Sequence, residues 1–127
     1  MDKRFYITTP IYYPSAKPHM GHAYSSIIAD FFARFKRMDG FDVQFLTGTD
    51  EHGLKIQRSA EKQNIDPLEF CNQISQTFRN LSKTLNLTNT DFIRTTEDRH
   101  KKTVQHLWNI LEKNDDIYLS KYSGWYS

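Results

Sequence analysis

Two hydrophobic patterns alternate along the first part of the chain, and together they predict a strand, a helix and a second strand. Residues 3–9 form a short run of β-branched and aromatic side chains, which is typical of a buried strand. From about His19 to Met38 the apolar residues recur every three or four positions, and Gly40 follows, so the spacing predicts a helix. Residues 43–47 predict a second strand. A strand, a helix of this length and a strand form a βαβ unit, which implies a parallel sheet and an α/β fold.

The second half of the chain is predicted to be mostly helical. Asp66 is an N-cap residue followed by Pro67 at the first helical position, a pair that often begins a helix. The expected elements are helices over Leu54–Gln63, from Asp66 and over about Glu97–Asn114, a strand over Phe92–Thr95, and a hairpin over Ile117–Ser127 that turns at Ser123-Gly124.

Two apolar stripes are expected to face the core. On the first helix the stripe contains Phe31, Phe32 and Phe35. On the last helix it contains Val104, Leu107, Trp108 and Leu111.

Composition narrows the class of protein. The 127 residues are 38% hydrophobic and 14% aromatic, which suits one globular domain with a core. A net charge of +2 does not argue for nucleic acid or a membrane surface. The single cysteine, Cys71, excludes an internal disulfide and a multi-cysteine zinc site. With no signal-like N-terminus and no bilayer-spanning apolar run, we expect a cytoplasmic protein and no membrane partner.

The first candidate for chemistry is Pro18-His19-Met20-Gly21-His22, where a proline-rich loop becomes a helix. A helix N-terminus offers free N–H groups and a positive dipole end, which suit a phosphate. Two histidines three residues apart can both donate to anionic oxygens, and Gly21 lets a flat ring lie against the backbone. The alternatives are a pair of surface histidines, or a metal pair completed by His52, Asp50 or Glu51.

The second candidate is the hexapeptide Gly48-Thr49-Asp50-Glu51-His52-Gly53, which follows the second predicted strand. Ligands of open α/β sheets bind at the carboxyl ends of strands, so this loop and the loop over residues 10–22 are expected to share one crevice. A carboxylate there suits an ammonium group. The alternative is a solvated acidic turn.

Other chemistry-bearing residues are weaker candidates. Cys71 is interpreted as a half-buried small residue on a helix rather than a nucleophile. His100 and His106, beside Lys101 and Lys102, are interpreted as a solvated helix face, with a phosphate backbone as the alternative contact.

The order of Pro10-Ile11-Tyr12-Tyr13, the His19–His22 motif and the Gly48–Gly53 loop resembles the start of the bacterial-type methionyl-tRNA synthetases. His19-Met20-Gly21-His22 matches the His-Ile-Gly-His signature of class I synthetases, which some nucleotidylyltransferases share. The Gly48–Gly53 loop is more specific to the methionine family. The resemblance covers essentially the whole chain.

This resemblance implies a Rossmann-like nucleotide-binding fold and a two-step ligase reaction. Methionine attacks the α-phosphate of ATP, which is used with Mg²⁺, and the methionyl group then passes to the methionine tRNA. The resemblance gives the catalytic role to His19 and His22, and ATP binding to these two residues with Gly21. It gives methionine binding to Ile11, Tyr13, Asp50 and His52, and no metal ligand.

The resemblance also implies that this is the amino-terminal part of a longer enzyme, because the sequence lacks a Lys-Met-Ser-Lys-Ser loop. Residues 1–116 are expected to form the first half of the catalytic domain, and residues 117–127 to begin the connective-peptide insertion. We expect this part to be inactive alone and to hold no zinc site. The alternatives are a free-standing nucleotidylyltransferase and a non-catalytic metal- or nucleic-acid-binding module.

Overall fold

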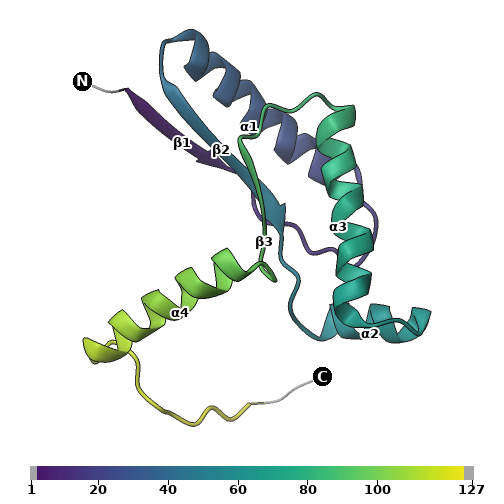
Figure 1. The fold of residues 1–127 in the computed structure, drawn as a ribbon, viewed down its shortest axis with the longest axis vertical. Helices are drawn as coiled ribbons and strands as arrows, with labels where there is room; N and C mark the ends of the chain where they lie inside the picture. The colour runs from purple at the N-terminus through teal and green to yellow at the C-terminus, as the bar shows by residue number, and fades with distance from the viewer. Residues whose placement is uncertain (1–2, 125–127) are drawn as a thin grey trace. The chain divides into compact units, whose positions relative to one another are not determined.

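The computed structural model of the chain describes residues 3–124, and the chain divides into two units, Met1–Glu97 and Asp98–Ser127. The first unit contains a parallel sheet of strands β1 (Arg4–Thr8), β2 (Asp42–Thr49) and β3 (Asp91–Arg94), in the order β1-β2-β3 (Figure 1). The predicted strands and their parallel pairing are therefore confirmed.

Three helices connect these strands. Helix α1 (Met20–Met38) joins β1 to β2 and packs on both, and helices α2 (Leu54–Gln63) and α3 (Pro67–Thr84) lie between β2 and β3 in the chain. Helix α3 packs on α2 and contacts β2 (Figure 1). Asp66 caps α3 as predicted, because its carboxylate accepts hydrogen bonds from the N–H groups of Leu68 and Glu69.

The core of the first unit lies between the sheet and these helices. Its buried apolar residues form three clusters: Ala29, Ala33, Val43 and Phe45 between α1 and the sheet; Ile56, Ala60, Phe70 and Cys71 between α2 and α3; and Tyr12, Phe78 and Phe92 between the first loop, α3 and β3.

Helix α1 turns its small residues to the sheet, so the prediction that Phe31, Phe32 and Phe35 belong to the core is wrong. Ala33 is fully buried, whereas 64% of Phe31 and 53% of Phe35 are exposed. The small stripe and the aromatic stripe both repeat at helical spacing, and the small one lets the helix approach the strands closely.

The described residues of the second unit, 98–124, contain one helix, α4 (Asp98–Lys113), which has no buried residue. The prediction that Val104, Leu107, Trp108 and Leu111 face inward is wrong for the described chain, since about half of Trp108 is exposed and Leu111 is only half-buried. The predicted hairpin over residues 117–127 lies partly outside the described residues, and its described part, residues 117–124, contains no strand. A two-stranded hairpin without a surface to cover it is only marginally stable.

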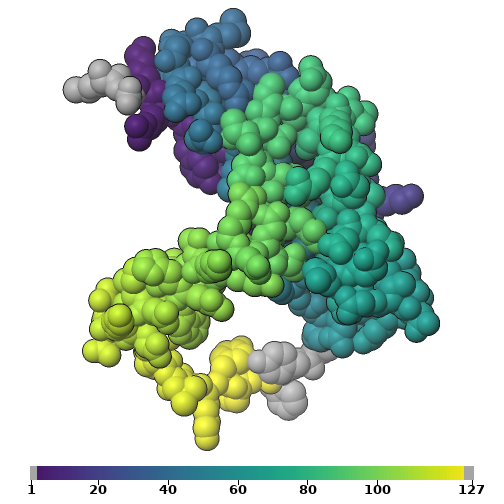
Figure 2. All heavy atoms as spheres, viewed as in Figure 1, coloured from purple at the N-terminus to yellow at the C-terminus, as the bar shows by residue number. Residues whose placement is uncertain are grey.

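The loop between α3 and β3 is tied to α1 at the amino end of β3 (Figure 2). Buried Asp30 of α1 accepts hydrogen bonds from the N–H and the hydroxyl of Thr88, both at 2.6 Å, and from Arg34 Nε at 2.6 Å. Burial alone would raise the pKa of Asp30, but the hydrogen bonds from Arg34 and Thr88 outweigh it and lower the pKa. No helix in the described residues is long and apolar enough to cross a membrane.

Candidate functional site

The two motif loops are hydrogen-bonded to each other at the carboxyl end of β2. The N–H of Tyr12 donates to Gly48 O at 2.9 Å, and the N–H of Asp50 donates to Tyr12 O at 2.9 Å. Tyr12 and Thr49 thereby form a parallel bridge that extends the sheet by one residue pair. The two loops that are expected to share one crevice therefore do lie together at the carboxyl end of β2, and the shared crevice itself stays a prediction.

His19 and His22 form the N-terminal cap of α1. His19 Nδ1 accepts a hydrogen bond from the N–H of Gly21 at 3.0 Å, and His22 Nδ1 accepts one from the N–H of His19 at 3.1 Å. Their rings stack with 3.8 Å between centroids. Because both Nδ1 atoms are acceptors, each neutral ring carries its proton on Nε2, which leaves two N–H donors at the helix N-terminus.

The site favours the neutral form of His22. Burial lowers the pKa of His22, and the neighbouring His19 lowers it further. Protonation at Nδ1 would also place a donor against the N–H of His19, which the cap geometry opposes.

Gly21 leaves room for the ring of His19. A Cβ at this position would lie 2.9 Å from His19 Cε1 and 3.1 Å from its Nδ1. A side chain at residue 21 would therefore push the ring away from its capping position.

Tyr12 is a site residue that the sequence analysis did not single out. Its hydroxyl lies 3.0 Å from Ser26 Oγ and donates to His22 O at 3.3 Å, and its ring stacks on Phe78. The edge of the His22 ring contacts it, with 4.7 Å between centroids. Tyr12 thus forms a buried support beneath the histidine motif.

Ile11 and Tyr13, the two predicted methionine-binding residues on either side of Tyr12, are 38% and 55% exposed. Neighbouring side chains of an extended segment point to opposite sides, so this alternation could have identified Tyr12 as the buried one.

The loop after β2 presents the carboxylate of Asp50 without a partner among the described residues. Asp50 is half-buried, and its side chain accepts no hydrogen bond from residues 3–124. His52 is exposed, and its Nε2 lies 3.3 Å from Thr95 O at the end of β3.

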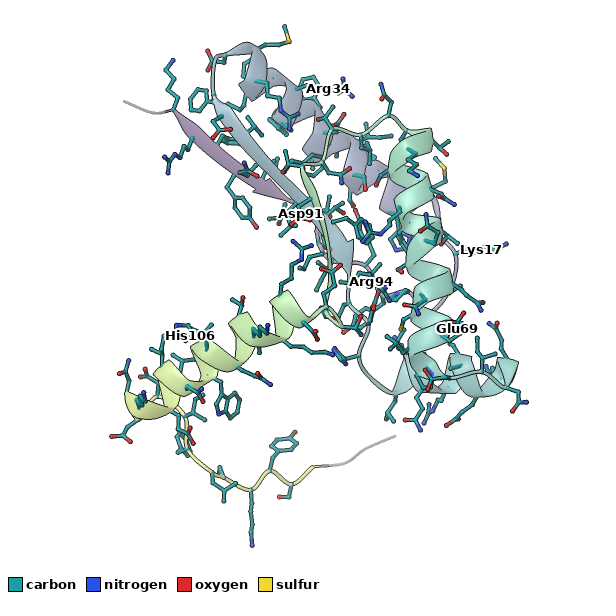
Figure 3. All side chains as sticks on the ribbon, viewed as in Figure 1. Lys17, Arg34, Glu69, Asp91, Arg94 and His106 are labelled. Carbon is teal, nitrogen blue, oxygen red and sulfur yellow. The ribbon has the colours of Figure 1, made fainter. Side chains whose placement is uncertain are left out.

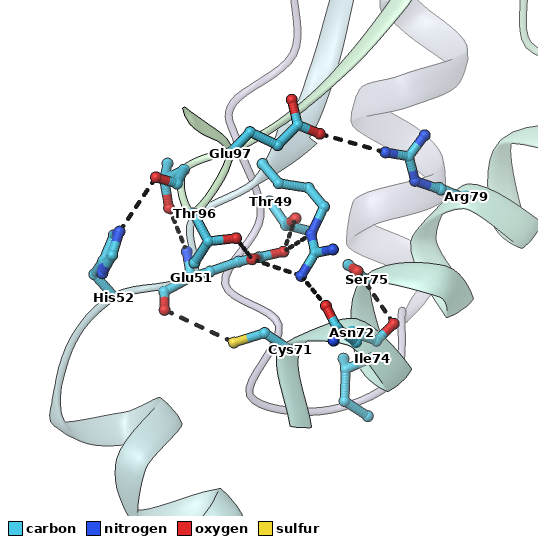
Figure 4. A network of polar contacts seen from close by, with 12 residues as sticks. Thr49, Glu51, His52, Cys71, Asn72, Ile74, Ser75, Arg79, Thr96 and Glu97 are labelled. Carbon is cyan, nitrogen blue, oxygen red and sulfur yellow. Dashed lines mark hydrogen bonds and ion pairs between the residues drawn. The ribbon is translucent and has the colours of Figure 1, made fainter. Parts of the chain in front are cut away.

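The adjacent acid, Glu51, is fully paired. Its side chain is completely buried and accepts hydrogen bonds from Thr49, Thr96 and the fork of Arg94, at 2.7 Å to Nε and 3.0 Å to Nη2 (Figure 4). These hydrogen bonds to Glu51 raise the pKa of Arg94. No local pattern indicates that one acid of the Asp50-Glu51 pair is buried, because its partners Arg94 and Thr96 are distant in the chain.

The weaker candidates have no site around them. Burial raises the pKa of Cys71 to about 11, so its thiol is protonated at neutral pH, and it contacts Glu51 O. Among residues 3–124 no group of three His, Cys, Asp or Glu side chains could hold a metal ion, the proposed combination of the histidines with Asp50, Glu51 or His52 included.

Comparisons with known proteins point to one family. The family model "tRNA synthetases class I (M)" matches residues 5–127. The methionine–tRNA ligase of Bacillus subtilis (strain 168) is 55% identical over 126 residues, which are 99% of this chain and 19% of that protein. The mitochondrial methionine–tRNA ligase of Takifugu rubripes is 54% identical over 99% of this chain and 21% of its own length.

A solved structure gives the same result. The methionyl-tRNA synthetase of Mycobacterium tuberculosis in complex with methionyl-adenylate superposes with a TM-score of 0.94 and 46% identity, covering 98% of this chain and 25% of that one. A leucyl-tRNA synthetase from Agrobacterium radiobacter K84, at 22% identity and a TM-score of 0.77, shares the fold. The chain thus spans about a fifth to a quarter of the proteins of its own kind that it matches.

Proposed function

The chain belongs to the class I tRNA synthetases of the methionine type, and we propose that it forms the first part of an active site that ligates L-methionine to its tRNA through methionyl-adenylate. One observation carries this proposal: backbone hydrogen bonds hold the loop before the histidine motif against the Asp50 loop at the carboxyl end of the sheet. Donors for phosphate and a carboxylate for an ammonium group are therefore on neighbouring loops.

In this proposal the histidine pair acts on ATP. The methionine carboxylate attacks the α-phosphate of ATP and pyrophosphate leaves, so negative charge develops on phosphate oxygens. The Nε2–H groups of His19 and His22 donate to these oxygens, and fixed donors of this kind stabilise a transition state without reorganisation. Gly21 provides the seat for adenine. ATP is used with Mg²⁺.

Methionine is bound by the second set of residues. Asp50 receives the α-ammonium group, His52 lies on the same loop, and Ile11 and Tyr13 line the side-chain pocket. The thioether has almost no polar handle, so apolar and aromatic walls are the expected means of selecting it. The half-buried Asp50 carboxylate, unpaired within the described residues, supports this role.

The chain covers only about a fifth to a quarter of the relatives' length, which supports a proposal for its place in a longer enzyme. We propose that residues 1–116 belong to the first half of the Rossmann-like catalytic domain and that residues 117–127 begin the connective-peptide insertion. The enzyme would pass methionine to the terminal adenosine of the methionine tRNA in the cytoplasm, although one similar protein is mitochondrial. No observation on residues 3–124 favours a free-standing nucleotidylyltransferase or a metal-binding module.

The test is methionine-dependent ATP–pyrophosphate exchange by an enzyme of the relatives' length that carries this segment. Asp50→Ala should lower kcat/KM for methionine about thirtyfold to several-thousandfold, because truncating one partner of a desolvated charge pair costs about 2–5 kcal/mol. The KM for ATP should change far less.

The matched control is Asp66→Ala, which removes another carboxylate of the same unit at the cap of α3. It should lower stability by about 1 kcal/mol and leave the methionine KM unchanged. An Asp50→Ala enzyme that keeps its methionine KM would contradict the proposed role, and a wild-type enzyme without methionine-dependent exchange would contradict the proposed function.

A further inference from the structure

The backbone on both sides of Asp50 is held, although its side chain has no partner in the described part of the chain. The N–H of Asp50 donates to Tyr12 O, and the N–H of Glu51 donates to Thr95 Oγ1 at 2.8 Å. Both peptide groups that flank the Asp50 Cα are thus held, and with them the direction of the Cα–Cβ bond from which the carboxylate extends.

The second of these anchors lies beside a buried ion pair formed by the Glu51 side chain. The side chain of Glu51 is completely buried, and Arg94, 18% of whose side chain is exposed, lies at the carboxyl end of β3 (Figure 3). Arg94 also donates from Nη2 to Asn72 of α3 at 2.8 Å, and the thiol of Cys71 contacts Glu51 O (Figure 4). The pair therefore joins the ends of β2 and β3 to α3, immediately beside Asp50.

Stability alone is a weak reason to bury this pair. Taking two charges out of water is costly, and well-packed apolar residues of similar volume often stabilise a protein as well or better. A buried carboxylate that accepts hydrogen bonds from several fixed partners does give one geometry, which a site that must present a neighbouring group requires.

We propose that Glu51 and Arg94 form a positioning pair that holds the Asp50 carboxylate where it receives the amino group of the amino-acid substrate. This inference rests on the proposed function and extends it, because neither residue touches the substrate. Loss of the pair would leave Asp50 in the sequence but let its loop move, and a displacement of about 1 Å can cost about a hundredfold in rate.

The chain offers a matched control at the opposite end of β3. Asp30 is also buried, is paired with an arginine (Arg34) and accepts two hydrogen bonds from Thr88, and it ties α1 to the loop before β3. Its disruption should destabilise the unit without moving Asp50. The two acid–arginine pairs therefore separate a positioning effect from a general loss of stability.

The experiment compares Glu51→Gln with Asp30→Asn in an enzyme of the relatives' length, by pyrophosphate exchange and by thermal unfolding. Both variants should melt at lower temperature. Glu51→Gln should lower kcat/KM for methionine about 10- to 100-fold while the KM for ATP stays within about twofold. Asp30→Asn should show no such split between the two substrates.

Arg94→Lys gives a second, milder measurement, because it keeps the positive charge beside Glu51 but loses the two-pronged contact and the Nη2 hydrogen bond to Asn72. Arg94→Lys should show a smaller loss of kcat/KM that is again specific to methionine. If Glu51→Gln does not fold, this variant tests the positioning role on its own. Equal losses of kcat/KM for methionine and for ATP, or an unchanged methionine KM in variants that fold, would overturn the positioning role. Pyrophosphate exchange by the wild-type enzyme would still support the proposed function in that case. A wild-type enzyme without exchange would overturn both.

Discussion

At the scale of single residues, the two ring nitrogens of His22 have different roles. Nδ1 of His22 caps the helix by accepting from the N–H of His19, and Nε2 is left as a donor. An asparagine can accept the same capping hydrogen bond, since its Oδ1 occupies a position similar to that of Nδ1. It has no atom at the position of Nε2. This difference separates folding from catalysis.

His22→Asn should therefore keep the start of α1 and slow adenylate formation. Removing one preorganised donor to developing charge costs about 10²–10³ in rate. Rapid-quench measurement of methionyl-adenylate formation in a full-length enzyme should show this loss, with methionine affinity nearly unchanged. A variant that formed adenylate at the wild-type rate would exclude His22 from the phosphate contacts.

The same residue predicts a pH dependence of stability. Burial, followed by the charge of His19, lowers the pKa of His22 below its ordinary value of 6.5, so the unfolded chain takes up this proton first. The contribution of His22 is complete above about pH 6.5 and falls as the pH drops from there toward the folded-state pKa. In urea unfolding between pH 7.5 and about 5, stability should decrease less steeply for His22→Asn than for the wild type; parallel curves would argue against this linkage.

The sequence predicts those site residues that can be recognised from their neighbours in the chain. The His19–His22 spacing at a helix start and the acid after β2 were both recognisable, and the parallel βαβ pattern predicted that their loops meet. Tyr12 and Glu51 were missed, because their roles depend on Phe78, Ser26 and Arg94, which only the fold brings near.

At the scale of elements, the distance between β2 and β3 is set by a glycine. A Cβ on Gly48 would lie 2.0 Å from Ile93 O and 2.7 Å from Ile93 Cγ2, and the carbonyl belongs to the backbone of a paired strand. The strands would have to separate directly before the Asp50 loop.

Gly48→Ala should therefore destabilise the enzyme by about 3 kcal/mol, the upper end of the usual cost of overpacking. Gly40→Ala is the control: its φ of +77° strains an alanine, but no atom lies within 4 Å, so the expected cost is about 1–2 kcal/mol. Urea unfolding measures both. Equal losses would mean that the contact with Ile93 is relieved at no cost.

Periodicity identified each helix but not the face that packs. In α1 the alanine stripe and the aromatic stripe have the same period, and the larger side chains suggested the wrong face. In α4 the apolar stripe exists as predicted, yet no described residue of that unit covers it. The spacing of apolar residues gives the direction of an apolar face and does not identify what packs against it.

At the scale of the whole molecule, helix α1 leaves a broad apolar surface uncovered within the first unit. Its exposed residues include Tyr24 at 68%, Phe31 at 64%, Phe35 at 53% and Met38 at 87%. β1 is at an edge of the sheet, pairing with β2 alone among the described strands. Monomeric proteins rarely expose contiguous apolar surface of this kind, and open edges invite pairing with another chain.

A polypeptide of these 127 residues should therefore self-associate in dilute buffer at micromolar concentration. Replacing Phe31 and Phe35 by serine removes aromatic area that is exposed in the unit, so the double variant should keep its helical circular dichroism. It should also associate less, because the driving force scales with the apolar area withdrawn from water. Sedimentation velocity over about a hundredfold range of concentration distinguishes the outcomes. A single monomeric species for the wild type would show that the aromatic face of α1 tolerates water, and equal association of the two proteins would place the contact at the edge of β1 or elsewhere on the chain.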